Sequence, residues 1–498
     1  FVSRGPRRHL SEPNLHLLMG CSRALGLLAV FAVGVPCSSR QIRWNFGRPA
    51  PQAEHPWPHA RGRMPGQFGA TSTIAPRNLS GSLAWSWHHP RGRYYNTVAG
   101  GPVIDSELNL YITNSDGVRK LSPGGEELWH YRPPNGVINN EASLSGGAVF
   151  GSAESGHAFA LDMGTGRPLW ERRLAESAGA DCGYPAAFGG VFVVGALMGQ
   201  DPRSLGGNQL VFGLNASTGA TLWQFRPEHP VWNLTPLFPG DGSTVFMDFT
   251  GGVYKLRLRD GMELWRSAAP KSNASFSDGG ASLGPDGAVY TCSNYGDGLG
   301  FVSTPGVVRA FGLAEGAMLW ESVLPQPCNS FPAVGSLGDS GSVSVVVTPG
   351  PFVGKPNLDG SILALDARTG GVQWQFHAPP YTGPLNMARG DLEGILPRLA
   401  HSPTHAMCLP AHWSAPTISG DGAVLAGRLD GKLYSVRGPG RGAPAPLAPA
   451  ALVAGSATSP GVEAEIFDAG GASLHGASAW ALGTLAFSTC DTLFVFRY

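Results

Sequence analysis

The sequence predicts an all-β protein: an eight-bladed β-propeller of four-stranded antiparallel blades, closed by pairing of the N- and C-terminal strands. Three observations predict it: a repeated hairpin, regularly spaced tryptophans, and chain ends that complement each other. The hairpin is clearest at residues 360–374, where an apolar strand leads into a turn and a second strand ends in Trp374. In that turn Asp366 and Thr369 can bond backbone N–H groups, and Gly370 supplies a positive φ.

The same hairpin returns along the chain. Residues 160–170 and 213–223 repeat it closely, and weaker copies occur elsewhere. The spacings between consecutive hairpin tryptophans are 41, 53, 42, 55 and 54 residues, for Trp129, Trp170, Trp223, Trp265, Trp320 and Trp374. Self-similarity at such a period indicates a repeat architecture. Two further strand-like runs precede each hairpin, and four short strands per repeat describe a propeller blade.

The two ends of the repeat region complete one blade. The last three strands, at residues 476–480, 485–488 and 492–496, lack a fourth. Residues 82–87, with Trp85, have the pattern of an outer strand that has no partner before it. Joining them leaves no open sheet edge and brings the number of blades to eight. We therefore expect Trp85 to lie beside Phe494.

Two segments precede the propeller. Residues 1–39 are predicted to be a leader with a signal peptide, because an arginine precedes the apolar run Leu25–Val35, which is too short to cross a bilayer. Residues 40–80 are rich in arginine and proline and are predicted to be a linker. The location expected is the exterior or the lumen of the secretory pathway. The alternative is a plastid protein with a two-part leader.

The propeller is expected over residues 81–498, with an insertion at 377–412 where the repeat rhythm breaks. Within this insertion, residues 391–396 could form a helical turn, so the insertion is a candidate lid. We expect a protein partner or a small ligand to bind at the face that carries it, and the protein to be a monomer with no transmembrane span in the mature chain.

Charge and cysteine content narrow the function classes. Lysine plus arginine and aspartate plus glutamate each number 35, so no long-range field favours nucleic acid. The sequence has no Cys-x-x-Cys pair, which gives no support to a zinc or thioredoxin-like site. Cys328 and Cys408 precede the first strands of neighbouring blades, so a disulfide between them is predicted to hold the lid.

The mouth of a propeller channel is built by the loops that lead into the innermost strands, so polar and aromatic residues there are candidates for ligand binding. Carboxylate and amide oxygens could form a cage for Ca²⁺, which takes six to eight such ligands. The alternative is that each residue caps a turn or contacts channel water. The candidates are Glu141, Asp181, Asp278, Asn329, His412 and Trp413.

The pattern of Leu161–Trp170 and Leu365–Trp374, a strand followed by Leu-Asp-x-x-Thr-Gly, three residues and Trp, resembles the tryptophan-docking repeat of propellers of the pyrroloquinoline quinone (PQQ) type. The resemblance covers roughly residues 80–498. It implies a circular eight-bladed propeller in which each tryptophan wedges between neighbouring blades. The residues to which this structural role extends are Trp85, Trp129, Trp170, Trp223, Trp265, Trp320 and Trp374.

The resemblance leaves two functions open. The family includes PQQ-dependent alcohol and sugar dehydrogenases, which use Ca²⁺, an aspartate base and often a disulfide of adjacent cysteines. It also includes a non-enzymatic eight-bladed lipoprotein that assists outer-membrane protein assembly. No two cysteines here are adjacent, and the acidic motif of the dehydrogenases has no counterpart. We therefore expect a non-catalytic binding or assembly scaffold without a cofactor. The alternative is a PQQ- and calcium-dependent dehydrogenase that oxidises alcohols or sugars, and no catalytic residue is assigned.

Overall fold

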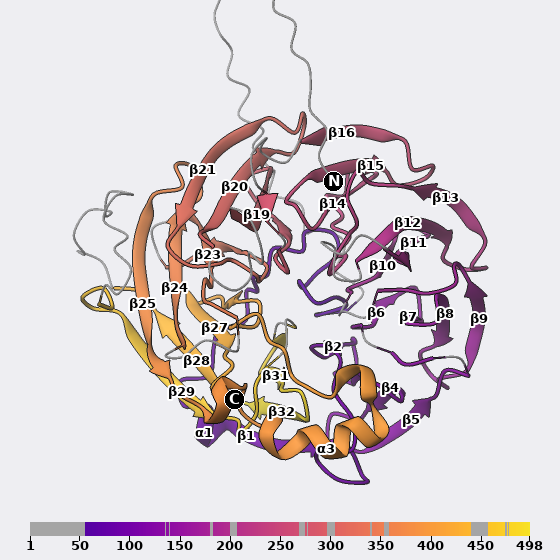
Figure 1. The fold of residues 1–498 in the computed structure, drawn as a ribbon, viewed down its shortest axis with the longest axis horizontal. Helices are drawn as coiled ribbons and strands as arrows, with labels where there is room; N and C mark the ends of the chain where they lie inside the picture. Colours follow the sequence, from indigo (N-terminus) through magenta and orange to yellow (C-terminus); the bar gives the residue numbers. More distant parts are fainter. Residues whose placement is uncertain are drawn as a thin grey trace, which may run out of the picture. The chain divides into compact units, whose positions relative to one another are not determined.

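The computed structural model describes residues 55–498, except for 135, 139, 180–182, 200–206, 268–273, 276, 296–303, 339–340, 353–357, 440–456, 474–475 and 477. The predicted leader at 1–39 lies outside the described residues. The described residues form eight antiparallel sheets arranged as blades in a ring (Figure 1). The predicted fold class is thus confirmed.

The first four blades follow the chain in order, from the inner strand outward. Blade 1 contains β2 (Val103–Ile104), β3 (Leu110–Asn114), β4 (Gly117–Leu121) and β5 (Glu127–Tyr131). Blade 2 contains β6 (Ser143–Ser145), β7 (Ala148–Ala153), β8 (His157–Asp162) and β9 (Pro168–Arg173). Blade 3 contains β10 (Ala186–Phe188), β11 (Val191–Met198), β12 (Asn208–Asn215) and β13 (Thr221–Phe225). Blade 4 contains β14 (Ser243–Met247), β15 (Val253–Arg257) and β16 (Glu263–Ser267).

The other four blades continue around the ring. Blade 5 contains β17 (Ala274–Ser275), β18 (Ala281–Leu283), β19 (Ala288–Tyr295), β20 (Gly306–Gly312) and β21 (Met318–Leu324). Blade 6 contains β22 (Ala333–Ser336), β23 (Val343–Val347), β24 (Leu358–Asp366) and β25 (Val372–Tyr381). Blade 7 contains β26 (Thr417–Ile418), β27 (Ala423–Gly427), β28 (Lys432–Arg437) and β29 (Glu463–Asp468). Blade 8 contains β30 (Ala479–Ala481), β31 (Thr484–Ser488), β32 (Thr492–Arg497) and β1 (Leu83–His88).

Blade 8 closes the ring as predicted. Strand β1 pairs antiparallel with β32, and the register places Trp85 opposite Val495 and Ser86 opposite Phe494. The first and last strands of the propeller therefore share one sheet. This pairing supplies the outer strand that the C-terminal repeat lacks, so β32 is not left as an open sheet edge.

Blade 4 departs from the four-strand pattern. Its innermost strand is reduced to an isolated bridge, in which the backbone N–H of Leu237 donates to Val245 and that of Val245 donates back, at 2.8 and 2.9 Å. Pro236 and Pro239 flank this bridge. Proline has no N–H to donate to a ladder, so Pro239 cannot form the next hydrogen-bonded pair with β14.

The hydrophobic core lies between blades. One cluster joins Phe150 of blade 2 to Phe192 and Phe212 of blade 3, and similar clusters occur at the other junctions. Strands of this kind have apolar residues on both faces, because each blade packs against a neighbour on either side. The ring therefore replaces a single central core with a series of interfaces.

Outer-strand tryptophans complete these interfaces. Each indole N–H donates to a carbonyl in the last turn of the next blade at 2.7–3.1 Å, in the pairs Trp85–Pro123, Trp129–Met163, Trp170–Ala216, Trp223–Leu258, Trp265–Leu313 and Trp320–Ala367. Trp374 is 5 % exposed and lies beside Gly438. The ring of Trp129 covers Gly166, where an added Cβ would lie 2.6 Å from it. The turn glycine thus serves two purposes, a positive φ of 70° and room for the neighbouring indole.

Two segments are not part of the blade repeats. Residues 55–78 lead into a short helix α1 (Leu79–Ser82), and the predicted boundary of the linker at residue 80 is wrong, because Trp57, His59 and Arg61 are buried within the ring. The insertion begins later than predicted, since β25 continues to Tyr381. It holds two 3-10 turns, η2 (Pro384–Asn386) and η3 (Pro403–His405), and between them helix α3 (Asp391–His401), which is longer than the single turn expected.

Candidate binding site

The predicted channel-mouth residues that the structure describes lie at separate places in the ring. Asp278 and Asn329 lie at the entries to blades 5 and 6, where amides tie neighbouring loops together. Asn233 Nδ2 donates to the Asp278 carbonyl at 3.1 Å, and Asn294 Nδ2 donates to Asn329 Oδ1 at 2.7 Å. Asp181 lies outside the described residues. Within the described part of the chain, no group of three or more His, Cys, Asp or Glu side chains is arranged to hold a metal ion.

Glu141 is buried near the axis of the ring. Its backbone N–H donates to Gly183 at 3.1 Å, and a Cβ at Gly100 would lie 2.8 Å from Glu141 Cβ, so the carboxyl group fills a space that glycine leaves. Burial raises its pKa well above the usual value, against the opposing effects of the Gly101 N–H and the Arg61 charge.

His412 and Trp413 lie between blades 6 and 7, each fully buried. The imidazole contacts the Pro351 carbonyl through Nδ1 at 2.9 Å, and Arg428 Nε donates to Nε2 at 3.0 Å. This pattern fits the neutral ring with its proton on Nδ1. Burial lowers the His412 pKa well below the usual value, and the Arg428 charge adds to this. The Arg428 guanidinium also lies 5.3 Å from the Trp413 ring. These three side chains join the two blades.

The centre of the ring is occupied by residues 57–75, drawn in indigo in Figure 1. This stretch, here called the axial segment, forms backbone bonds to inner strands: Trp57 with Ile104 of β2, Pro58 with Leu144 of β6, Phe68 with Val334 of β22, and both Gly69 and Thr71 with Ile418 of β26. Further bonds reach residues next to the first strand of blade 3 and the inner bridge of blade 4, through His59 and Gln67. The axial segment therefore bonds to six of the eight blades.

His59 and Gln67 fix the axial segment by a shared set of bonds. His59 Nε2 lies 3.0 Å from the Tyr184 carbonyl, which has only acceptor capacity, so Nε2 carries the proton. His59 Nδ1 then accepts from the Arg61 N–H at 3.2 Å and from Gln67 Nε2 at 3.1 Å. Burial lowers the His59 pKa to about 4, the Tyr184 carbonyl opposes this, and the Arg61 charge adds to it. The ring is therefore neutral at physiological pH.

Arg61 places a cation on the axis. Its side chain is 1 % exposed, and the guanidinium donates to the carbonyls of Pro332 and Pro416, which directly precede the inner strands of blades 6 and 7. Burial lowers its pKa to about 10, opposed by Tyr184 and by Glu141, so it stays charged. Sequence reasoning missed His59, Arg61 and Gln67, because nothing in residues 40–80 repeats or alternates. The signal available was the presence of large aromatic residues in this region, among them Trp57 and Phe68.

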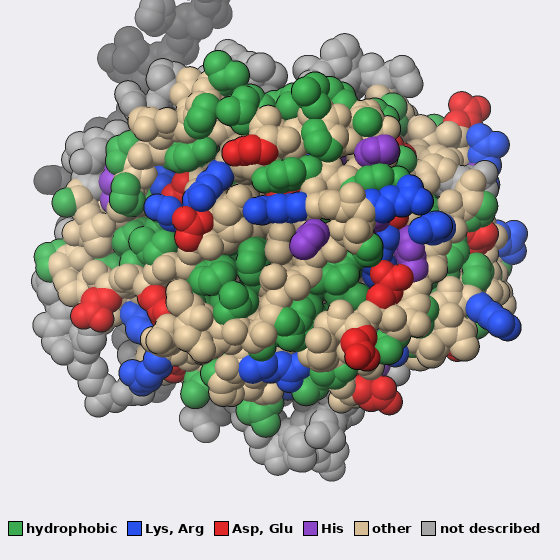
Figure 2. Space-filling model, turned by 90° about the horizontal axis from the view of Figure 1, so that it is seen from below, with side chains coloured by type: hydrophobic (Ala, Val, Ile, Leu, Met, Phe, Trp, Pro, Cys, Tyr) green, Lys and Arg blue, Asp and Glu red, His purple; other side chains and the backbone are tan. Residues whose placement is uncertain are grey.

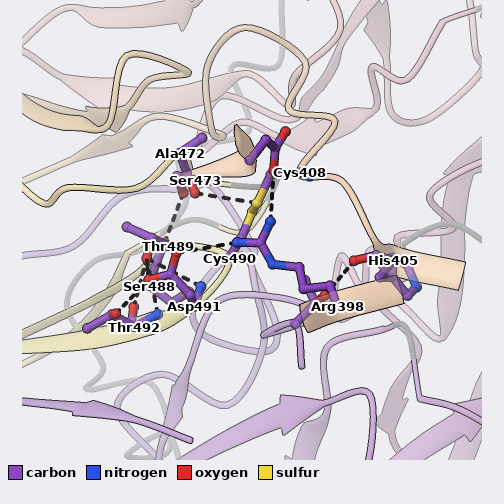
Figure 3. Close-up of a disulfide and its surroundings, with 12 residues drawn as sticks. Arg398, His405, Cys408, Ala472, Ser473, Ser488, Thr489, Cys490, Asp491 and Thr492 are labelled. Carbon is purple, nitrogen blue, oxygen red and sulfur yellow. Dashed lines mark hydrogen bonds and ion pairs between the residues drawn. A yellow bond between two sulfur atoms is a disulfide. The ribbon is translucent and has the colours of Figure 1, made fainter. Parts of the chain in front are cut away.

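The lid is attached to blade 8 by ionic and covalent contacts (Figure 3). Arg398 of α3, fully buried, bonds to Asp391 at 2.9 Å and lies 3.5 Å from Asp491. Asp491 also accepts from Arg93 Nε at 2.7 Å. Burial raises the Asp391 pKa to about 6, opposed by the Cys408 N–H and by Arg398. Two buried carboxyl groups thus share one site with the buried Arg398 and the partly exposed Arg93.

The predicted disulfide Cys328–Cys408 is wrong. Cys328 pairs with Cys292 of β19, at a Cα–Cα distance of 5.4 Å, and Cys408 pairs with Cys490, at 6.1 Å. Both distances suit a disulfide. The sequence argument placed both cysteines on entry loops of adjacent blades. In the ring, however, the entry loop with Cys328 lies against β19 of blade 5, which holds Cys292. The entry loop with Cys408 lies against the turn between β31 and β32 of blade 8, which holds Cys490. The Cys408–Cys490 bond still holds the lid.

A small hollow lies between blades 2 and 3. Its polar side chains are already used within the protein: Asn140 Nδ2 donates to the Ser152 carbonyl at 2.7 Å, and Asn208 Oδ1 accepts from the Gly179 N–H at 2.7 Å. Glycine and apolar residues form much of the remaining wall. The hollow therefore offers little specific recognition of a charged ligand.

The outer surface carries mixed charge. On the edge of the ring shown in Figure 2, basic and acidic side chains are interspersed with apolar ones. This distribution accords with the equal numbers of positive and negative residues in the sequence. Among the described residues, no helix is both long enough and apolar enough to cross a membrane.

Comparison with known families decides the relationship. The sequence profile of the family described as outer membrane protein assembly factor BamB matches residues 114–305 and 253–396, which together exceed half of the chain. The chain belongs to this family of PQQ-type β-propellers. No curated protein sequence matches this PQQ-type propeller.

Solved structures share the fold of this PQQ-type propeller. BamB from Moraxella catarrhalis aligns with a TM-score of 0.56 at 16 % identity, covering 84 % of this chain and 99 % of its own. Quinohemoprotein alcohol dehydrogenase from Comamonas testosteroni aligns with a TM-score of 0.54 at 14 % identity, covering 89 % and 80 %. The computationally designed protein Ika8 reaches 0.52 at 13 % identity, covering 82 % and 98 %. At these identities the likeness concerns the fold alone, and both an assembly factor and an oxidoreductase share it.

Proposed function

We propose that this PQQ-type propeller is a non-catalytic scaffold that binds a protein partner at the face carrying the lid. The observation that carries the proposal is the axial segment. The inner strands of a propeller surround the place where a ligand on the axis would bind, and here the chain's own residues bond to those strands in six blades.

The residues at the centre do not favour a quinone on the axis. A quinone on the axis would have to displace His59 and Arg61, whose polar atoms already bond to Tyr184, Pro332 and Pro416. The geometry therefore supports a filled ring with a binding face on its exterior. A role as assembly factor, as in the name of the family, is consistent with such a ring.

The disulfides support a proposed location outside the cytosol. Cys292–Cys328 and Cys408–Cys490 each join separate blades or loops. Such bonds persist in oxidising compartments. We propose that the protein is secreted or resides in the lumen of the secretory pathway, and that it acts as a monomer.

The test is incubation of the purified protein with PQQ and CaCl₂, followed by dye-linked oxidation of primary alcohols and aldose sugars. A PQQ-dependent alcohol dehydrogenase serves as the positive control. We expect no turnover above buffer, and no change in hydrogen exchange of residues 57–70. Turnover abolished by a chelator, together with altered exchange of the axial segment, would establish the alternative: a PQQ- and calcium-dependent dehydrogenase.

A further inference from the structure

Helix α3 has its polar face turned inward and its apolar face turned outward. The residues facing the propeller are Asp391, Gly394 and Arg398, all buried. Leu392, Leu396 and Leu399 are 50, 75 and 48 % exposed. A surface helix of a globular protein normally shows the reverse arrangement, because apolar burial drives its packing. The exposed leucines therefore need a reason other than the stability of the propeller.

The inward face explains how the helix stays in place without apolar burial. Arg398 bonds to Asp391 and to Asp491, and the Cys408–Cys490 disulfide holds the chain that follows the helix. Gly394 is needed on this face, since a Cβ there would lie 2.6 Å from Arg398 Cζ. Polar and covalent contacts thus fix α3 and leave its leucines available. A fixed surface loses little conformational entropy when it binds a partner.

The outward face has the dimensions of a helix contact. Leu392, Leu396 and Leu399 stand at positions i, i+4 and i+7, which form one stripe along about two turns, roughly 10 Å. Leu385, 78 % exposed, precedes the helix. The apolar face of an amphipathic helix presents residues at the same spacing and is recognised by such surfaces. Exposed apolar patches of this kind mark interaction sites.

The charge on this face selects among possible occupants. The exposed residues of α3, all of them described, include one carboxylate, Glu393, one histidine, His401, and neither lysine nor arginine. Helices that bind at a lipid surface carry lysine and arginine, which anionic headgroups attract. Glu393 would be repelled by such a surface. A second copy of the chain is disfavoured too, because its own α3 would offer Glu393 no lysine or arginine to pair with.

We propose that α3 is the docking site for an amphipathic helix of a partner protein, with leucine-like residues at i, i+4 and i+7 and a basic residue placed to meet Glu393. This inference deepens the proposed scaffold function and rests on it. It assigns the partner contact to the stripe of Leu392, Leu396 and Leu399, which is called the leucine stripe below.

The probe is a fluorescein-labelled peptide of about 15 residues, the length at which isolated helices begin to form. It carries leucine along one helical face and lysine and glutamine elsewhere. A second peptide has the same composition in scrambled order, and a third has glutamate in place of lysine. Binding to the full chain is followed by fluorescence anisotropy. The variants are Leu396→Glu, Glu393→Lys and, as matched control, Leu482→Glu, which alters a 90 % exposed leucine in the turn between β30 and β31.

The wild type is expected to bind the patterned lysine peptide and not the scrambled one. Leu396→Glu should weaken binding at least about tenfold, and Leu482→Glu should leave it unchanged. Glu393→Lys should weaken the lysine peptide and favour the glutamate peptide, which a merely hydrophobic contact would not produce. Circular dichroism of each variant verifies that the propeller is intact, and Leu396 is exposed enough for the substitution to leave the fold unchanged.

Three results would overturn the inference. Equal binding of the scrambled peptide would show that binding does not depend on the helical spacing of the leucines. Sedimentation of the wild type, and not Leu396→Glu, with vesicles of equal parts phosphatidylcholine and phosphatidylglycerol would identify a lipid surface. Dimers of the wild type that Leu396→Glu abolishes would identify a second copy. The scaffold proposal is refuted by a different result. Chelator-sensitive turnover with PQQ would refute it even if the peptide binds. Equal binding of the patterned and scrambled peptides, without turnover, would refute only the docking site.

Discussion

Replacing Gly166 by alanine tests whether each interblade tryptophan depends on the glycine of the next turn. An added Cβ would lie 2.6 Å from Cδ2 and 2.7 Å from Cε3 of Trp129, closer than packed carbon atoms approach. The indole must therefore move, and its hydrogen bond to the Met163 carbonyl, 3.1 Å long, moves with it. The backbone at Gly166 also has a φ of 70°, which alanine adopts at a cost.

The expected loss has two parts. Alanine in a left-handed conformation costs about 1 to 2 kcal/mol. Displacing a packed side chain costs a further 1 to 3 kcal/mol, roughly. Gly147 of the same blade supplies the matched control, because its φ is 75° and no atom lies within 4 Å of an added Cβ. Gly147→Ala should therefore lower the free energy of unfolding by the first amount only, and Gly166→Ala by about 2 to 5 kcal/mol.

The assay is urea unfolding of both variants followed by far-ultraviolet circular dichroism. The cycle is completed in a Trp129→Ala background, where Gly166→Ala should cost no more than Gly147→Ala, because the indole it displaces is gone. Equal destabilisation by Gly166→Ala and Gly147→Ala in the wild-type background would refute the reasoning. So would a Gly166→Ala penalty that persists in full without Trp129.

Other predictions concern stability and the lid. Trp374→Ala should cost about 3 to 5 kcal/mol in urea unfolding, since the side chain is 5 % exposed, and a loss under about 1 kcal/mol would contradict its packing role. The His59 pKa of about 4 means that the unfolded chain binds more protons between pH 6.5 and 4, so the free energy of unfolding should fall by about 3 kcal/mol as pH drops through that window. His59→Gln should flatten this slope, and an unchanged slope would exclude His59 as its source. Replacing Cys408 and Cys490 by serine should speed hydrogen exchange in α3 while β32 stays protected, and equal exchange would show that the disulfide does not hold the lid.

The propeller could be predicted because its signals repeat. The turn at Asp366, Thr369 and Gly370 forms as expected, with Asp366 Oδ1 accepting from the Thr369 N–H at 2.9 Å and from its hydroxyl at 2.8 Å. The incomplete last blade and the unpartnered strand at Trp85 fixed where the ring closes. Turn chemistry and strand alternation act over a few residues, so a repeated local pattern specifies a repeated unit and its number.

Features that occur once were decided by the tertiary structure. Arg61 bonds to Pro332, 271 positions away, and no local pattern marks that contact. The disulfide partners depend on which strand each loop crosses. The inward polar face of α3 depends on Asp491 lying beneath it, so its leucines could be placed outside only when blade 8 was in position. Local sequence determined the repeated blades and their closure, whereas the filled axis, the cysteine pairs and the exposed helix face arise from single long-range contacts that only the assembled ring brings together.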